Sequence, residues 1–419
     1  MAALEVLGKV PPHIRKLLQE PRNLRLYNHR IQLLYNNHEF TECQRLIDTV
    51  LKENPLSSFA RHIQALIYRH QGKVNDSVEL FASVVENSGN YDSKYHYARS
   101  LYLQGRLDDA LEMLKECMRE RDNDAQVMHY AGVCSVRLSN NSDAIEFFKR
   151  SIKLSHHPDS YIQLGRLYAE LDDSDMALRM FNEAIDYFPH NIKVLTALGI
   201  HFLRKGHRQN AFNHLGAALT FDPFDGSALL AAGAVLQDSG DVEVALTKYR
   251  ILAKSHAHLQ FWNNVGVCFF LKRDYVSAVA CLQRALEMSP FDWIISFNLA
   301  CAYLMTRQYF SAFLNISRSI NLNRKYAASF KFLALALTKL EDHVNAEQAY
   351  IRAIKLAGNT PDHVTLLNYA IFQYNRENFT GAKDTFLQFQ RVYDTLPPDE
   401  KNIAEVAANN RIMKSALNL

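Results

Sequence analysis

The sequence predicts an all-α protein built as a tandem array of helical hairpins. Three observations support this prediction: a pattern that recurs every 33 to 36 residues, small residues at two fixed positions of the pattern, and glycine or proline where helices should end. The composition agrees, because 48% hydrophobic and 22% charged residues are typical of a folded globular protein. With 419 residues, the chain is long enough for two or three domains or for one such array.

The pattern can be followed eleven times. Its units start at residues 24, 58, 91, 125, 158, 192, 226, 259, 293, 327 and 363. The eighth position is Gly or Ala in every unit but the first, the twentieth is Ala from the third unit on, and the twenty-fourth is always large and apolar. Small residues at positions 8 and 20 let two helix backbones approach closely, and the large residue fills the space beside them.

The stretch Trp262–Phe270 (WNNVGVCFF) is rich in aromatic and β-branched residues, so composition alone would allow a strand. Positions 4, 7, 8 and 11 of the repeat nevertheless lie on one stripe of a helix, which predicts a helix here. Several units have glycine at position 15 and proline at position 32, where the two helices should end (Gly72, Gly105, Gly206 and Gly240; Pro55, Pro189, Pro223 and Pro290). Each unit is therefore expected to be helix, turn, helix, turn.

We expect an N-terminal extension (1–23), the repeat array (24–396) and a C-terminal capping segment (397–419). Residues 399–417 are predicted to form one more helix that covers the last repeat, with Ile403, Val406, Ile412 and Met413 on its apolar side. The chain starts without the unbroken apolar run of a secretory signal, and no apolar run is long enough to span a bilayer. An intracellular, soluble protein without membrane insertion is expected.

At these positions the sequence resembles the tetratricopeptide repeat, a 34-residue helical hairpin with the pattern W-x2-L-G-x2-Y, then A-x3-F, A and P. The resemblance implies a right-handed superhelical solenoid in which the first helices line the concave surface. Positions 2, 5, 6, 9, 12 and 13 of each first helix would then face away from the core, and we call this side the groove face.

Two parts of the groove face are candidates for binding a partner. Asn264, Asn298 and Asn368 share position 6, where a row of amides could hold the backbone of an extended peptide; solvated or capping asparagines are the alternative. In repeats seven to ten the groove face is apolar, with Leu230, Phe270, Phe297, Leu304 and Phe332, and also Leu271 and Met305. A partner could cover this surface, or the curvature of the solenoid or its own C-terminal helix could do so.

The groove face of repeats one to five is more basic. Arg99, Arg166, His62, His96 and His129 belong to a set of basic residues that outnumbers the acidic ones. An acidic partner segment could dock there, although a solvated face explains the same pattern.

The sequence shows no sign of catalytic, cofactor-binding or metal-binding chemistry. No nucleotide-binding or hydrolase motif is present, the six cysteines form no CxxC pair, and the paired histidines lack further metal ligands nearby. We expect a protein that is not an enzyme. A net charge of +3 is too small to indicate nucleic acid as a partner.

Four segments are only partly explained by the repeat consensus: HLGAALTFDPFDGSALLAAG (214–233), DVEVALTKYR (241–250), WNNVGVCFF (262–270) and PFDW (290–293). They resemble the family of the fourth Bardet–Biedl syndrome protein, most closely over about 192–350. That resemblance implies a scaffold subunit of the BBSome, a coat-like complex that carries membrane proteins into and out of cilia, with a role in cilium formation. Members of that family extend into a low-complexity C-terminal tail, whereas this chain ends at Leu419, so the resemblance assigns no role to a tail.

The same resemblance implies the other BBSome subunits as partners, together with pericentriolar material and dynein–dynactin components. It implies a location in the cytoplasm, at the cilium and basal body, and at the centrosome with its centriolar satellites. The groove face of repeats seven to ten would hold a segment of a fellow subunit. An adaptor subunit of another large assembly, such as a cell-cycle or RNA-processing complex, is the alternative.

Overall fold

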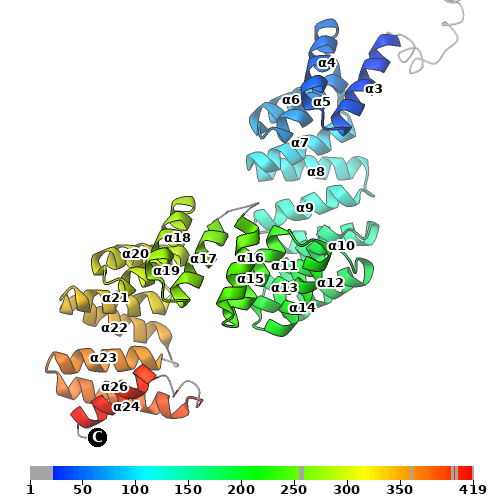
Figure 1. Cartoon of the computed structure of the whole chain (residues 1–419). Helices are drawn as coiled ribbons and strands as arrows, with labels where there is room; N and C mark the ends of the chain where they lie inside the picture. The colour runs from blue at the N-terminus through cyan, green and yellow to red at the C-terminus, as the bar shows by residue number, and fades with distance from the viewer. Residues whose placement is uncertain (1–21, 254–258, 359–361, 398–400, 402–403, 418–419) are drawn as a thin grey trace, which may run out of the picture. The chain divides into compact units, whose positions relative to one another are not determined.

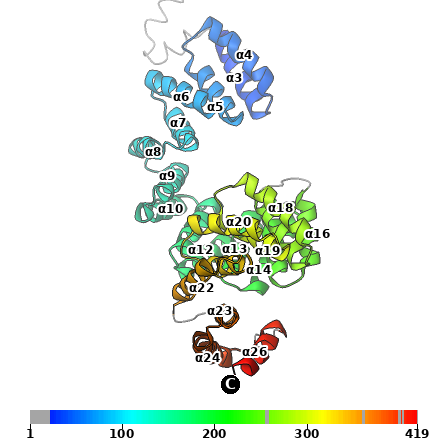
Figure 2. The same ribbon diagram turned by 90° about the vertical axis from the view of Figure 1, so that its left-hand side faces the viewer.

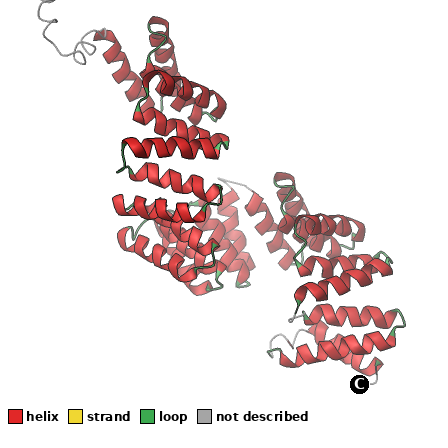
Figure 3. Cartoon of the chain, turned by 180° about the vertical axis from the view of Figure 1, so that it is seen from behind, coloured by secondary structure: helices red, strands yellow, loops and turns green. Residues whose placement is uncertain are grey.

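The computed structural model describes residues 22–253, 259–358, 362–397, 401 and 404–417 (Figure 1). Most of the expected N-terminal extension lies outside these residues. Within them, all regular secondary structure is helical, and Figure 3 shows only helices joined by loops. The chain divides into two compact units, one up to His201 and one from Phe202 onwards, with the boundary inside one helix. None of the described helices is both long and apolar enough to cross a bilayer.

In the first unit, first and second helices alternate along the chain, and neighbouring helices lie side by side in both Figures 1 and 2. The second helices α4, α6, α8 and α10 each pack against the first helices of their own hairpin and of the next one. The first helices are α3 (Arg22–Asn36), α5 (Ser58–His70), α7 (Tyr91–Gln104), α9 (Ala125–Arg137), α11 (Pro158–Glu170) and α13 (Ile192–Arg204), which contains the unit boundary. The second helices are α4 (Phe40–Glu53), α6 (Val74–Ser88), α8 (Leu107–Glu120), α10 (Asn141–Leu154) and α12 (Ser174–Tyr187).

The second unit continues with the same alternation. Its second helices are α14 (Arg208–Phe221), α16 (Val242–Ala253), α18 (Tyr275–Met288), α20 (Tyr309–Leu322), α22 (His343–Ala357) and α24 (Phe379–Thr395). Its first helices are α15 (Gly226–Asp238), α17 (Leu259–Leu271), α19 (Trp293–Met305), α21 (Ala327–Lys339) and α23 (His363–Asn375).

The last helix, α26 (Ala404–Ala416), packs against α23. Val406 and Met413 are buried in one cluster with Leu366 and Phe389, as the sequence predicts for its apolar side. The prediction for Ile412 is wrong, because this side chain is 63% exposed. Val406 and Met413 are seven residues apart and share one side of the helix, whereas the position before Met413 is turned about 100° away. Ile403 lies outside the described residues.

The close approach of the two helices in a hairpin is confirmed at position 8. A Cβ atom added to Gly132 would lie 2.7 Å from the Phe148 ring, and one added to Gly165 would lie 2.8 Å from the Phe181 ring. Both rings occupy position 24 of the same hairpin and are buried. The absence of a side chain at position 8 therefore makes room for the large residue of the second helix.

The turn inside each hairpin has one backbone conformation throughout the array. Position 15 is left-handed in all eleven repeats, although only four of them have glycine there. The other seven are His38, Ser139, Asp172, Arg273, Arg307, Glu341 and Glu377, with φ between 60° and 64°. A left-handed conformation costs a non-glycine residue about 1–2 kcal/mol, so the packed hairpin imposes this geometry at the expense of local strain.

We predict that Gly165→Ala destabilises the first unit by about 1–3 kcal/mol, because the new methyl group must displace the buried Phe181 ring. Gly216→Ala is the matched control, since a Cβ there meets nothing within 4 Å on helix α14. Denaturant unfolding, combined with amide exchange of α11 and α12, measures the effect. Equal stability of the two variants would contradict the close approach at position 8.

We also predict that Ser139→Gly and Glu341→Gly stabilise their hairpins by about 0.5–1 kcal/mol each, because glycine removes the left-handed strain but adds freedom to the unfolded chain. The reverse substitution Gly105→Ala should destabilise, since φ is 90° there although a Cβ has open space. Thermal unfolding of the three variants provides the comparison. A lower melting temperature for both glycine variants would show that position 15 is not strained.

Candidate partner-binding surfaces

A chain of hydrogen bonds between amides crosses the groove face of repeats eight and nine. Asn298 Nδ2 donates to Asn263 Oδ1 at 3.0 Å, and Asn263 Nδ2 donates to Asn264 Oδ1 at 3.2 Å. Asn264 Nδ2 in turn donates to the hydroxyl oxygen of Tyr249 at 3.3 Å. Burial raises the pKa of Tyr249, so its hydroxyl stays protonated near neutral pH. The chain joins helices α16, α17 and α19.

The structure thus places two of the three predicted asparagines in a row, but the row differs from the predicted one. Asn264 and Asn298 both bond to Asn263, which occupies position 5, and so they are connected through it rather than standing open. The side chain of Asn368, on α23, makes no hydrogen bond to another described residue and takes no part in this row. The predicted ladder of three equivalent amides is therefore not formed as such.

Aromatic rings lie next to the amides. Phe297 on α19 contacts Tyr326 and Phe332, with ring centroids 5.3 Å apart in each pair. Tyr326 also contacts Trp293, at 4.8 Å. These edge-to-face and tilted contacts join the first helices of repeats nine and ten into a continuous aromatic strip, and each such pair stabilises by about 0.5–1.5 kcal/mol beyond simple burial.

Much of the predicted apolar groove is covered by the chain itself. Leu230, Phe270, Leu304 and Phe332 are half-buried and pack against the cores of their own repeats. Leu271 and Met305, the last residues of α17 and α19, are each 50% exposed. The accessible apolar surface is therefore smaller than the sequence predicts, and it is concentrated at the C-terminal ends of these two helices.

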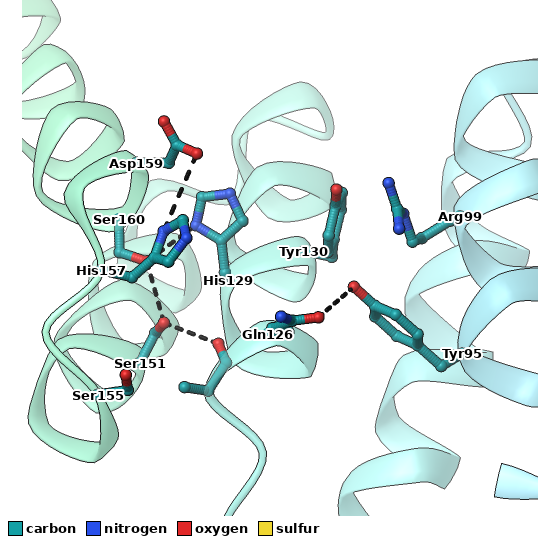
Figure 4. A pocket seen from close by; sticks show the side chains of 11 residues that line it. Tyr95, Arg99, Gln126, His129, Tyr130, Ser151, Ser155, His157, Asp159 and Ser160 are labelled. Carbon is teal, nitrogen blue, oxygen red and sulfur yellow. Dashed lines mark hydrogen bonds and ion pairs between the residues drawn. The ribbon is translucent and has the colours of Figure 1, made fainter. Parts of the chain in front are cut away.

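In the first unit, Arg99 lies at the edge of a cleft of about 310 Å³ (Figure 4). Its guanidinium is 4.7 Å from the Tyr130 ring centroid and 5.7 Å from that of Tyr95, within cation–π distance of both. The Tyr95 hydroxyl donates a hydrogen bond to Gln126 Oε1 at 3.2 Å. Arg166, also predicted as a binding residue, is exposed on α11.

His62 and His129 carry no charge near neutral pH. The Nδ1 atom of His62 lies 2.8 Å from Ser93 Oγ, and that of His129 lies 2.9 Å from Ser160 Oγ, so the same pair recurs two repeats later. Burial lowers the pKa of each imidazole to about 4, and a nearby aspartate opposes this only in part. The prediction that these two histidines make the groove face basic is therefore wrong, and they add no positive charge to it.

Sequence reasoning missed three residues that take part in these surfaces. Asn263 is at position 5 and Arg69 at position 12, both on the groove face, so the repeat register could have identified them. Tyr249 at position 24 is a core residue, as its position predicts, but the repeat spacing does not indicate that its hydroxyl accepts a hydrogen bond from Asn264. Within the described part of the chain, no group of three or more His, Cys, Asp or Glu side chains could hold a metal ion.

Comparison with known proteins identifies the repeat and its relatives. Residues 64–125, 158–191 and 230–292 match models of the tetratricopeptide repeat family. The BBSome complex member BBS4 of Bos taurus is 37% identical over 368 residues, which are 87% of this chain and 70% of that protein. Its counterpart in Mus musculus is 38% identical with the same coverage. The Drosophila melanogaster homolog is 27% identical over 390 residues, covering 88% of this chain and 80% of that one.

Solved structures support the fold. The APC/C hetero-tetramer Cut9–Hcn1 contains a chain that superposes with a TM-score of 0.50 at 15% identity, covering 95% of this chain and 97% of that one. The human IFIT1 dimer with PPP-AAAA gives a TM-score of 0.54 at 14% identity, covering 79% and 83%. At this identity the likeness shows only an all-α tetratricopeptide architecture. The sequence relationship goes further, and on its strength the chain belongs to the family of the BBSome complex member BBS4.

Proposed function

We propose that the chain is a scaffold subunit of the BBSome that performs no catalysis and serves in ciliary membrane-protein transport and in cilium formation. The observation that carries this proposal is the match to BBS4 proteins, which extends over 87% of the chain at 37% identity. The groove face supports the same role, because amides and rings held in a fixed row suit a permanent partner. Localisation at the basal body and centrosome, and contacts with pericentriolar material and dynein–dynactin, are the finer parts of this proposal.

The groove face of repeats eight and nine is the proposed contact with a fellow subunit. Leu271 and Met305 are the exposed apolar residues there, and each lies seven residues after Asn264 or Asn298, about two turns further along α17 or α19. Burying the exposed half of each side chain in an interface would stabilise the complex by about 0.8–1.5 kcal/mol per residue. Phe270 and Phe297 are less suitable for testing the contact, because they also pack within the chain and their removal would disturb the fold.

We predict that the double variant Leu271→Asp/Met305→Asp lowers the recovery of BBSome subunits at least tenfold, because two carboxylates would have to be buried in an apolar contact. The variants are expressed with an affinity tag in ciliated cells, and the co-purified subunits are measured by mass spectrometry. Circular dichroism and the melting temperature should be unchanged, since both residues are half exposed in the free protein.

The matched control is Val276→Asp/Phe310→Asp. These side chains are 77% and 64% exposed on the second helices α18 and α20, so the chemical change is the same on another face. This variant should retain the subunits. If the control variant lost the subunits and the groove variant retained them, the contact would lie on the second helices instead. If the unaltered protein recovered no BBSome subunits, the proposed function itself would be overturned.

A further inference from the structure

Two arginines on the groove face of the first unit lack a carboxylate partner among the residues that the structure describes. Arg69 on α5 donates from Nη1 to the backbone oxygen of His96 at 3.2 Å and from Nη2 to His96 Nδ1 at 3.4 Å. Arg99 on α7 packs over the rings of Tyr130 and Tyr95. No ion pair between described residues involves either guanidinium.

This arrangement is unfavourable in the free protein. Burial and the nearby charge of Arg99 lower the pKa of Arg69 to about 10, so Arg69 remains charged at neutral pH. The two hydrogen bonds to His96 replace only part of the hydration that this partly buried cation loses, and a second cation nearby adds repulsion. His96 supplies no negative charge to balance Arg69. Its Nδ1 accepts a hydrogen bond from Arg69, and the imidazole is neutral because burial lowers its pKa to about 3.

The acidic residues of the same region are used elsewhere. Asp159 lies 3.4 Å from Lys193, and Asp124 accepts the Tyr91 hydroxyl proton at 2.9 Å while also capping α9. Asp92 lies at the start of α7, where its charge raises the pKa of His62 and so opposes part of the effect of burial. Nothing among the described residues therefore neutralises Arg69 and Arg99 from within the unit.

Open space lies beside Arg99, and His96, which accepts the hydrogen bonds of Arg69, lines a neighbouring cleft. A cleft of about 410 Å³ is lined by Tyr35, His62 and His96, and the cleft of about 310 Å³ in Figure 4 is lined by Tyr95, Arg99 and Tyr130. The two clefts lie on successive first helices of repeats one to five. Tyrosine hydroxyls and the forked donors of arginine are the groups that recognise carboxylates, often through paired hydrogen bonds.

We propose that this surface of repeats one to five, the arginine site, binds an acidic peptide segment of a partner protein through carboxylates that contact Arg69 and Arg99. The segment has neutral residues between its carboxylates, because Asp92 and Asp159 line the same clefts and would repel a continuous polyanion. The arginine site belongs to the first unit and involves none of the residues of the groove contact proposed above, so either can fail without the other.

The test uses the full chain and a peptide array. Twelve-residue peptides carry two or three Glu at every spacing in a Gly, Ser and Leu background, and a second array carries Gln at the same positions. The best Glu peptide is then measured by fluorescence anisotropy. It should bind at least tenfold more tightly than its Gln counterpart, and raising the salt from 50 to 300 mM should weaken it severalfold.

Arg69→Gln/Arg99→Gln should reduce binding of the Glu peptide to that of its Gln counterpart. The matched control, Arg318→Gln/Arg352→Gln, removes the same charge from exposed arginines on α20 and α22 and should bind as the unaltered protein does. Equal affinity for both peptides, or equal loss in both variants, would overturn the proposal. Tighter binding of a phosphoserine peptide or of a twelve-nucleotide RNA at the same residues would also overturn it, because the ligand would then be a phosphate.

A second variant separates ligand binding from a structural role. Arg69→Met keeps the length of the side chain without its charge, and its melting temperature should equal or exceed that of the unaltered protein, because an uncompensated charge has been removed. The Glu peptide should raise the melting temperature of the unaltered protein but not that of this variant. A fall of several degrees with peptide binding unchanged would identify Arg69 as a structural residue and refute the arginine site.

Discussion

The contact between Gly or Ala at position 8 and a large side chain at position 24 holds together every hairpin after the first. Gly132, Gly165 and Gly266 leave room that Phe148, Phe181 and Leu282 fill, and those large residues are fully buried. Because this contact and the packing of second helices on the next hairpin use one side of each first helix, the opposite side carries fewer of the contacts that hold the hairpins together. The groove face can therefore vary in chemistry from repeat to repeat while the fold stays the same.

The fold could be predicted from sequence because its determinants are local and recur. Spacing, small residues and apolar stripes each report on one hairpin, and eleven repetitions make the pattern unambiguous. The left-handed turn was visible only where glycine marks it. At Ser139, Arg273 and the other non-glycine turns the residue type carries no such signal, because the packed helices on either side determine the backbone conformation. At Ile412 the residue type is misleading instead: an apolar side chain predicts burial, but this one is exposed to solvent on its helix.

The binding surfaces could be predicted only in part, because their chemistry depends on contacts between repeats. The register located Asn264 and Asn298, but the bond from Asn298 to Asn263 joins residues 35 apart and depends on side-chain conformation. The charge of a side chain also depends on its contacts and burial, which residue type alone does not give. His62 and His129 are basic by residue type, yet burial keeps them neutral, whereas Arg69 keeps its charge in a similar environment because its intrinsic pKa is far higher. The two units thus differ: the amides of repeats eight and nine bond to one another, whereas two arginines of the first unit have no counter-ion among the described residues.

That internal satisfaction does not prevent the amide row from binding a peptide backbone. Each amide nitrogen carries a second hydrogen and each amide oxygen a second lone pair, so Asn263, Asn264 and Asn298 retain donors and acceptors after bonding to one another. Their mutual hydrogen bonds restrict the side-chain rotamers before any partner arrives, which removes about 0.5–1.5 kcal/mol of ordering cost for each side chain on binding. The aromatic strip beside them is restrained in the same way by ring contacts. A row of asparagines that looks self-contained in the free chain is therefore better prepared for a permanent partner than three separate, solvated amides would be.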